Sequence, residues 1–240
     1  MRFPAGPVWE TLFVQSVPPA VSGAELGIVV AGVAMLSIPR ATWRYFGLFL
    51  TLVHEAGHAA AALGVGQKVT GIELRFDHSG LTTSMGRGGW RAGWCTFWGY
   101  PVPAIVGTVM VWLALDGWAV PGLVGGTGLL LLTGLLVRNL QGAVIVLGLS
   151  AVAVALLWWG TPELLGHVVL IVGLALLVGA LRDLAKVISV HTRRRRELHS
   201  SDAYLLARLS GIPSPVWLAL FGIVIGLSVA VAAEMLSSAL

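Results

Sequence analysis

His54, Glu55 and His58 are the residues of this 240-residue chain whose types and spacing best suit metal chemistry. They lie in the segment LVHEAGHAAA and form the pattern H-E-x-x-H. On a helix, a spacing of four places both imidazoles on one face, about 5–6 Å apart at Cβ, which suits two ligands of one zinc ion (Zn2+). Glu55 follows the first histidine and suits a general base that takes a proton from a water molecule at the metal.

A third metal ligand must come from elsewhere, because a catalytic zinc has three protein ligands and one position for water. Asp183 closes the apolar run HVVLIVGLALLVGALRD, where an unpaired carboxylate would be costly, and is the preferred candidate. Its alternative role is a salt bridge with Arg182 or Lys186. The second candidate is Asp202 in HSSDAYLLARL, where Ser201 and Asp202 also have the pattern of a helix N-cap.

The composition predicts a membrane protein. Hydrophobic residues make up 57% of the chain and charged residues only 11%, against about 25% charged in soluble domains. We therefore expect a single all-α polytopic domain over residues 1–240, integral to a bacterial cell membrane. Ionisable groups at membrane depth are costly, so the H-E-x-x-H cluster is better explained by function than by a solvated helix face.

Seven stretches are apolar and long enough to be membrane helices, which predicts six to seven spans. In the third, Pro101 and Pro103 predict a kink or break. Lys and Arg gather after the second, fourth and sixth stretches, which places the N-terminus in the cytoplasm and the C-terminus outside. The stretches cover about 22–38, 45–65, 94–115, 120–137, 142–159, 164–190 and 214–236.

A polar insert at about 68–90 follows the metal-binding segment. Residues 72–76 alternate apolar and polar, 77–80 are turn residues, and 81–84 suit a returning strand, so we expect a small β-hairpin. Its exposed edge would bind an extended peptide, unless the hairpin is only a connection. Asn139, in LLVRN, is placed to hydrogen-bond a substrate carbonyl or to cap a helix.

A basic cytoplasmic loop is expected at about 186–212. It contains Arg193, Arg194, Arg195 and Arg196 in a row. Beside a membrane span, such a run predicts contact with anionic lipid rather than with nucleic acid. The lone cysteine, Cys95, excludes an intramolecular disulfide framework.

These motifs together resemble the site-2 protease class of intramembrane zinc metalloproteases, in its compact bacterial branch. The resemblance rests on TLVHEAGHAAAALGVG, the hairpin with Gly80, WGYPVPAIVG, LLVRN, ALRDL and SSDAYLLARLSGIPSPVW, over residues 42–220. It implies that His54 and His58 bind zinc, that Glu55 is the catalytic base, and that an Asp on a later helix is the third ligand. The family's L-D-G and N-x-x-P elements are absent, and the nearest equivalent is the stretch with Asp183.

The function expected from this resemblance is hydrolysis of a peptide bond in a membrane-embedded or juxtamembrane segment of a membrane protein. Two alternatives use the same His/Glu cluster: a catalytically silent scaffold that binds membrane helices, and a metal or ion transporter. A transporter would spread ionisable residues along several helices, and the outer halves of these spans have few. The residues do not determine the oligomeric state.

Overall fold

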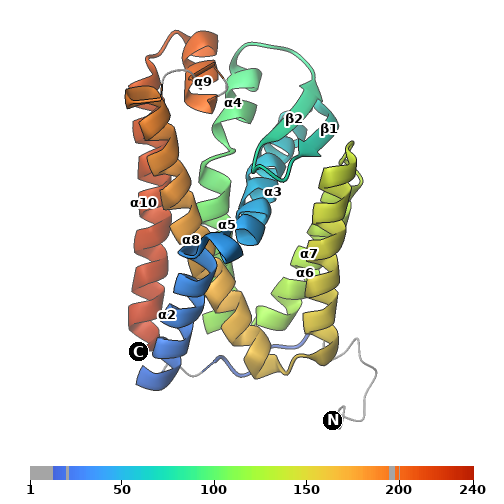
Figure 1. The fold of residues 1–240 in the computed structure, drawn as a ribbon, viewed down its shortest axis with the longest axis vertical. Helices are drawn as coiled ribbons and strands as arrows, with labels where there is room; N and C mark the ends of the chain where they lie inside the picture. Colours follow the sequence, from blue (N-terminus) through green and yellow to red (C-terminus); the bar gives the residue numbers. More distant parts are fainter. Residues whose placement is uncertain (1–12, 20–21, 195–197, 200) are drawn as a thin grey trace.

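The structure, a computed structural model, is a helical bundle with one two-stranded antiparallel sheet (Figure 1). It describes residues 13–19, 22–194, 198–199 and 201–240. The predicted class, a helical membrane protein with a small hairpin, is confirmed in this coarse form. The elements are α2 Gly23–Ser37, α3 Arg40–Gly64, β1 Lys68–Leu74, β2 Gly80–Met85, α4 Trp90–Phe97, α5 Pro101–Leu115, α6 Ala119–Gly134, α7 Leu140–Trp159, α8 Pro162–Thr192, α9 Asp202–Ser210 and α10 Ser214–Ala239.

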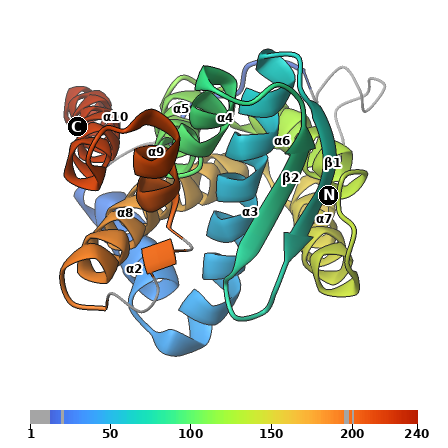
Figure 2. The same ribbon diagram turned by 90° about the horizontal axis from the view of Figure 1, so that it is seen from above.

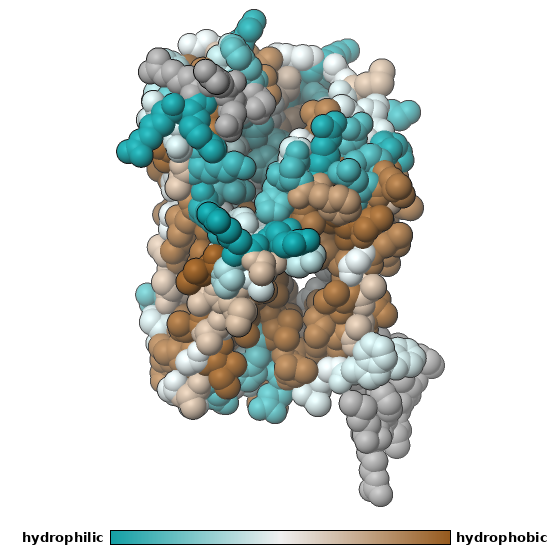
Figure 3. Space-filling view, viewed as in Figure 1, coloured by the Kyte–Doolittle hydropathy of each residue, from teal (hydrophilic) through white to brown (hydrophobic). Residues whose placement is uncertain are grey.

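Four of the described helices are long and apolar enough to cross a membrane, namely α3, α7, α8 and α10. Helices α4 and α5, bent by 50° at the break before Pro101, make a fifth span if they are counted as one. Helices α2 and α6 have 15 and 16 residues, too few to cover the roughly 30 Å of a hydrocarbon core. The expected six to seven spans are therefore not confirmed. Apolar side chains cover much of the lower half of the face in Figure 3.

Helix α8 is the central helix and packs against α2, α5 and α10. It meets α5 most closely where a Cβ added to Gly107 would lie 2.7 Å from the carbonyl oxygen of Gly173. Small residues at such a crossing let two membrane helices pack backbone to backbone. The core between these helices includes Val29, Val111, Val169, Leu170 and Ile225.

Helices α2 and α3 do not form the antiparallel pair that the first two predicted spans imply. Helix α2 runs parallel to α8, because Gly32 lies against Ile171 and Ser37, further along, accepts a hydrogen bond from Arg182. Helix α3 continues upward from the end of α2 (Figure 1). Residues 13–19 and the end of α10 lie at the same end of the molecule. The membrane side of each terminus stays a prediction.

The hairpin has one covered edge and one open edge. The peptide groups of Ile72 bond outward from β1, since its N–H donates to Leu136 and its carbonyl accepts from Arg138. Ile72 pairs with Thr82 on β2. In an antiparallel pair of this kind, the peptide groups of both partners face away from each other, so those of Thr82 point to the outer edge of β2. Among the described residues, no further strand pairs with that edge.

Asn139, placed from the sequence either to hydrogen-bond a substrate carbonyl or to cap a helix, caps α7 and completes the covered edge of β1. Its Oδ1 accepts from the N–H groups of Leu74, at 3.1 Å, and Gly142, at 3.3 Å, and its Nδ2 donates to the carbonyl of Leu74 at 2.7 Å. The side chain therefore pairs with Leu74 as a neighbouring strand would, and caps α7. Leu74 lies opposite Gly80, so the peptide groups of Gly80 also face the open edge of β2.

We expect Asn139→Ala to lower the free energy of unfolding by about 1–3 kcal/mol, because the cap and both bonds to Leu74 are lost. Thermal unfolding of the purified protein in detergent measures the effect. Gln141→Ala is the matched control, since Gln141 accepts one exposed hydrogen bond, from Phe76. Equal midpoints for the two variants would contradict this role of Asn139.

Candidate metal centre

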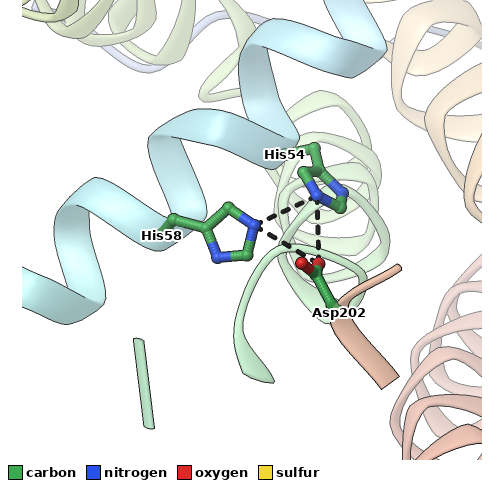
Figure 4. A group of neighbouring side chains, drawn as sticks. All are labelled: His54, His58 and Asp202. Atoms are coloured by element: carbon green, nitrogen blue, oxygen red, sulfur yellow. Dashed lines mark hydrogen bonds and ion pairs between the residues drawn. The ribbon is translucent and has the colours of Figure 1, made fainter. Parts of the chain in front are cut away.

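Helix α3 carries His54, Glu55 and His58, and the two histidines point toward the same space (Figure 4). Their ring centroids lie 4.8 Å apart and their Nε2 atoms 3.1 Å apart. Seen from above, α3 lies between the hairpin on one side and α8 with α9 on the other (Figure 2). The helical spacing of the motif thus brings its two imidazoles together, as the sequence predicts.

Asp202 brings a carboxylate to the same point from a distant part of the chain. Its Oδ2 lies 3.3 Å from Nε2 of each histidine. Asp202 is the first residue of α9, and Ser201 caps this helix by accepting a hydrogen bond from Tyr204 N–H. The Ser201 hydroxyl also lies 2.7 Å from Nε2 of His191 at the end of α8. Capping and the contact with α8 therefore fix the position of Asp202.

The geometry of these three atoms fits a metal ion. Bonds of about 2.0–2.2 Å to a tetrahedral zinc ion place its ligands about 3.3–3.6 Å apart, and the observed separations are 3.1, 3.3 and 3.3 Å, at or slightly below the lower end of that range. Oδ2 of Asp202 is buried and accepts no hydrogen bond from the described residues. Within the described ranges, these three residues are the one group of His, Cys, Asp or Glu side chains that could hold a metal ion.

The Asp202 carboxylate is kept ionised. Burial raises the pKa of this group, but the imidazoles of His58 and His54 outweigh burial and hold the pKa of Asp202 well below its usual range. The ionised carboxylate is the form that binds a metal ion.

Neighbouring groups orient both imidazoles. Nδ1 of His58 lies 2.8 Å from the carbonyl oxygen of Cys95 on α4. A carbonyl only accepts, so Nδ1 carries a proton, and in the neutral ring the lone pair of Nε2 is left for a metal. The ring of Tyr100 lies edge-on to His54, with centroids 4.9 Å apart. The residue at position 99 must be glycine for the chain to pass this close to the two imidazoles, because a Cβ at Gly99 would overlap Nε2 of both histidines.

Glu55 is held by strand β2 and is only 5% exposed. The hydroxyl of Thr82 donates to Oε2 of Glu55 at 2.6 Å and lies 3.0 Å from its carbonyl oxygen. Gly80 lies against the same carboxylate, because a Cβ there would overlap it. No described residue donates to Oε1 of Glu55. One oxygen of the carboxylate is therefore bound and the other is available.

A cavity of about 600 Å³, called here the metal cavity, contains these groups. Asp183, the preferred third ligand from the sequence, lines this cavity but lies outside the metal-binding group. Its alternative, a salt bridge with Arg182 or Lys186, is also not formed among the described residues. The geometry favours Asp202, because the N-cap role falls to Ser201 and leaves the Asp202 carboxylate for a metal.

Sequence reasoning missed the roles of Thr82, Tyr100 and the carbonyl of Cys95. A backbone carbonyl has no residue type that could signal it. Thr82 could be found only from its position two residues after Gly80 in the predicted returning strand, which places both on one face.

Comparison with known protein families shows which family the chain belongs to. The profile of the family described as peptidase M50B-like matches residues 26–232, which include α3, the hairpin and Asp202. The chain belongs to this family. It is the site-2 protease family, so the resemblance seen in the sequence motifs is confirmed. No curated protein and no solved structure matches the chain. Family and long apolar helices together identify an integral membrane protein.

We expect the purified protein to hold about one zinc ion per chain, and His54→Ala and Asp202→Ala to lose it, because each removes one of three ligands. Asp183→Ala is the control and should keep the metal. Elemental analysis of detergent-purified protein, with its unfolding midpoint, measures both. Loss of zinc in Asp183→Ala but not in Asp202→Ala would reverse the assignment.

Proposed function

We propose that this protein is a zinc metallopeptidase that hydrolyses a peptide bond in a membrane-embedded or juxtamembrane segment of another membrane protein. In this proposal His54, His58 and Asp202 hold the zinc ion, and Glu55 is the catalytic base. The observation that carries the proposal is the convergence of the three ligand atoms in one cavity beside Glu55. Membership of the peptidase M50B-like family supports the same reaction class.

The residues around the cavity suit this chemistry. Bound zinc would supply a Lewis acid that polarises the scissile carbonyl and lowers the pKa of a water molecule to about 7. Glu55 takes a proton from the attacking water and gives it to the leaving amine. Because Thr82 binds Oε2 of Glu55, Oε1 is the oxygen that exchanges the proton.

The open edge of β2 supports binding of the substrate as an extended chain. The peptide groups of Gly80 and Thr82 face this edge, and both residues line the metal cavity. A strand added here runs beside Glu55, because Thr82 contacts the Glu55 carboxylate. A helical substrate must unwind first, since its peptide groups are already bonded within the helix.

The proposal is tested by incubating the purified protein with bacterial membranes and identifying new protein N-termini by mass spectrometry. Wild-type protein should produce N-termini that are absent with Glu55→Gln, which keeps the three ligands and the size of the side chain. A zinc chelator should abolish them and added zinc restore them. If wild type and Glu55→Gln hold zinc equally but give identical N-termini, the peptidase assignment fails.

Thr82→Val should lower the rate of Glu55-dependent cleavage about tenfold, because the base loses the hydrogen bond that orients it. The loss should fall on kcat rather than KM, and zinc content should not change. Thr82→Ser, which keeps the hydroxyl, should restore most of the rate.

The matched control is Thr83→Val, the same change one residue on. The Thr83 hydroxyl bonds to Gly71 and Thr70 and not to Glu55. Equal losses in Thr82→Val and Thr83→Val would show that only the hairpin was disturbed.

A further inference from the structure

A second cavity of about 310 Å³, called here the basic cavity, adjoins the metal cavity. It lies between the first half of α3, the turn of the hairpin and the end of α8. Its charged and titratable lining residues are the cations Arg182, Lys186 and Arg194, the imidazole of His78, and one carboxylate, Asp183. The two cavities share Thr51, His78, Asp183 and Lys186.

Arg182 is held in a fixed position in this cavity. Its Nη1 donates to the carbonyl of Ser37, at the end of α2, at 2.7 Å. Its guanidinium carbon lies 3.9 Å from the ring centroid of Trp43, which also lines the cavity. A guanidinium has five N–H donors, and the other donors of Arg182 have no partner among the described residues. The group is therefore oriented, and its other donors are open to solvent or to a ligand.

Lys186 follows Arg182 by one helical turn on the same face of α8. Neither residue forms an ion pair with an acidic side chain in the described part of the chain. The carboxylate in the cavity, Asp183, does not neutralise either cation by direct contact. Two neighbouring cations, of which Arg182 is held in place, create a positive potential that favours an anion.

The basic cavity lies where the apolar part of α8 ends. Residues 164–181 contain one ionisable residue, His167, and Arg182 follows them directly. At about 1.5 Å per residue, this run approaches the roughly 30 Å thickness of a hydrocarbon core. Arg182 and Trp43 therefore lie at the depth of lipid headgroups, where Trp is enriched in membrane proteins.

We propose that the basic cavity binds the phosphate group of an anionic phospholipid. The guanidinium fork of Arg182 matches phosphate oxygens, and Lys186 adds a second positive charge. An acidic side chain of a peptide in the metal cavity would have to pass Asp183, which lies in the wall shared by both cavities and repels it. A lipid headgroup instead arrives beside Trp43.

This site extends the lipid contact expected near Arg193–Arg196. Of that run, Arg194 lines the basic cavity, while Arg195 and Arg196 lie outside the described residues. The proposal is independent of peptidase activity, because none of its cations belongs to the metal-binding group.

Native mass spectrometry of the detergent-purified full chain, titrated with dioleoyl phosphatidylglycerol or dioleoyl phosphatidylcholine, tests the proposal. Wild type should retain one phosphatidylglycerol in preference to phosphatidylcholine. Arg182→Gln with Lys186→Gln should weaken phosphatidylglycerol binding about tenfold or more. The matched control is Arg75→Gln with Arg208→Gln, which removes the same charge from residues outside the cavity and should bind as wild type does.

The proposal would be overturned by equal retention of both lipids, by equal effects of the two double variants, or by displacement of the lipid by millimolar inorganic phosphate or glycerol 3-phosphate. Displacement would identify a site for a soluble anion. Displacement by an acidic peptide would likewise identify a peptide subsite. If the double variant does not fold, the single variant Lys186→Gln tests the proposal. Lys186 is exposed and makes no hydrogen bond or ion pair with the described residues, so its replacement should not disturb the fold. Unchanged binding of phosphatidylglycerol by this variant would overturn the proposal.

Discussion

Two imidazole nitrogens and one carboxylate oxygen lie 3.1–3.3 Å from one another and point toward the same space. Atoms of this kind repel each other at such distances unless a proton or a cation lies among them. The surrounding structure maintains this arrangement. Helix α3 supplies two atoms, α9 supplies the third, and the carbonyl of Cys95 on α4 accepts a hydrogen bond from the Nδ1–H of His58.

Different helices contribute in different ways to holding these three atoms together. Helices α5 and α8 pack closely at Gly107 and Gly173, and α10 packs against both of them. The break between α4 and α5 brings Gly99 directly against the two histidines, which a continuous helix with a side chain at that position would prevent. Helix α9 is too short to cross a membrane, and its one charged residue in the first turn completes the cluster. The candidate metal centre is thus assembled from α3, the break between α4 and α5, and the short helix α9.

Sequence reasoning predicts the parts of the site that depend on local spacing. The histidine pair and Glu55 follow from helical periodicity alone, and the break before Pro101 follows from the missing N–H of proline. The third carboxylate does not follow, because it depends on how α9 packs against α4 and α10. Asp183 has a suitable depth on α8, yet Asp202 lies against the histidines. The six to seven predicted spans are not confirmed, and composition alone cannot show that α3 continues in the same direction as α2.

For the proposed peptidase, the open edge of β2 would also limit where a bound chain is cut. Only every second residue of a strand directs its peptide groups to a given edge, here Gly80 and Thr82. A chain paired with this edge can shift along it only in steps of two residues, because a shift of one turns its own peptide groups away and exchanges its two faces. Secondary cut sites within one substrate should therefore be separated by even numbers of residues, a pattern that the masses of the cleavage products would reveal.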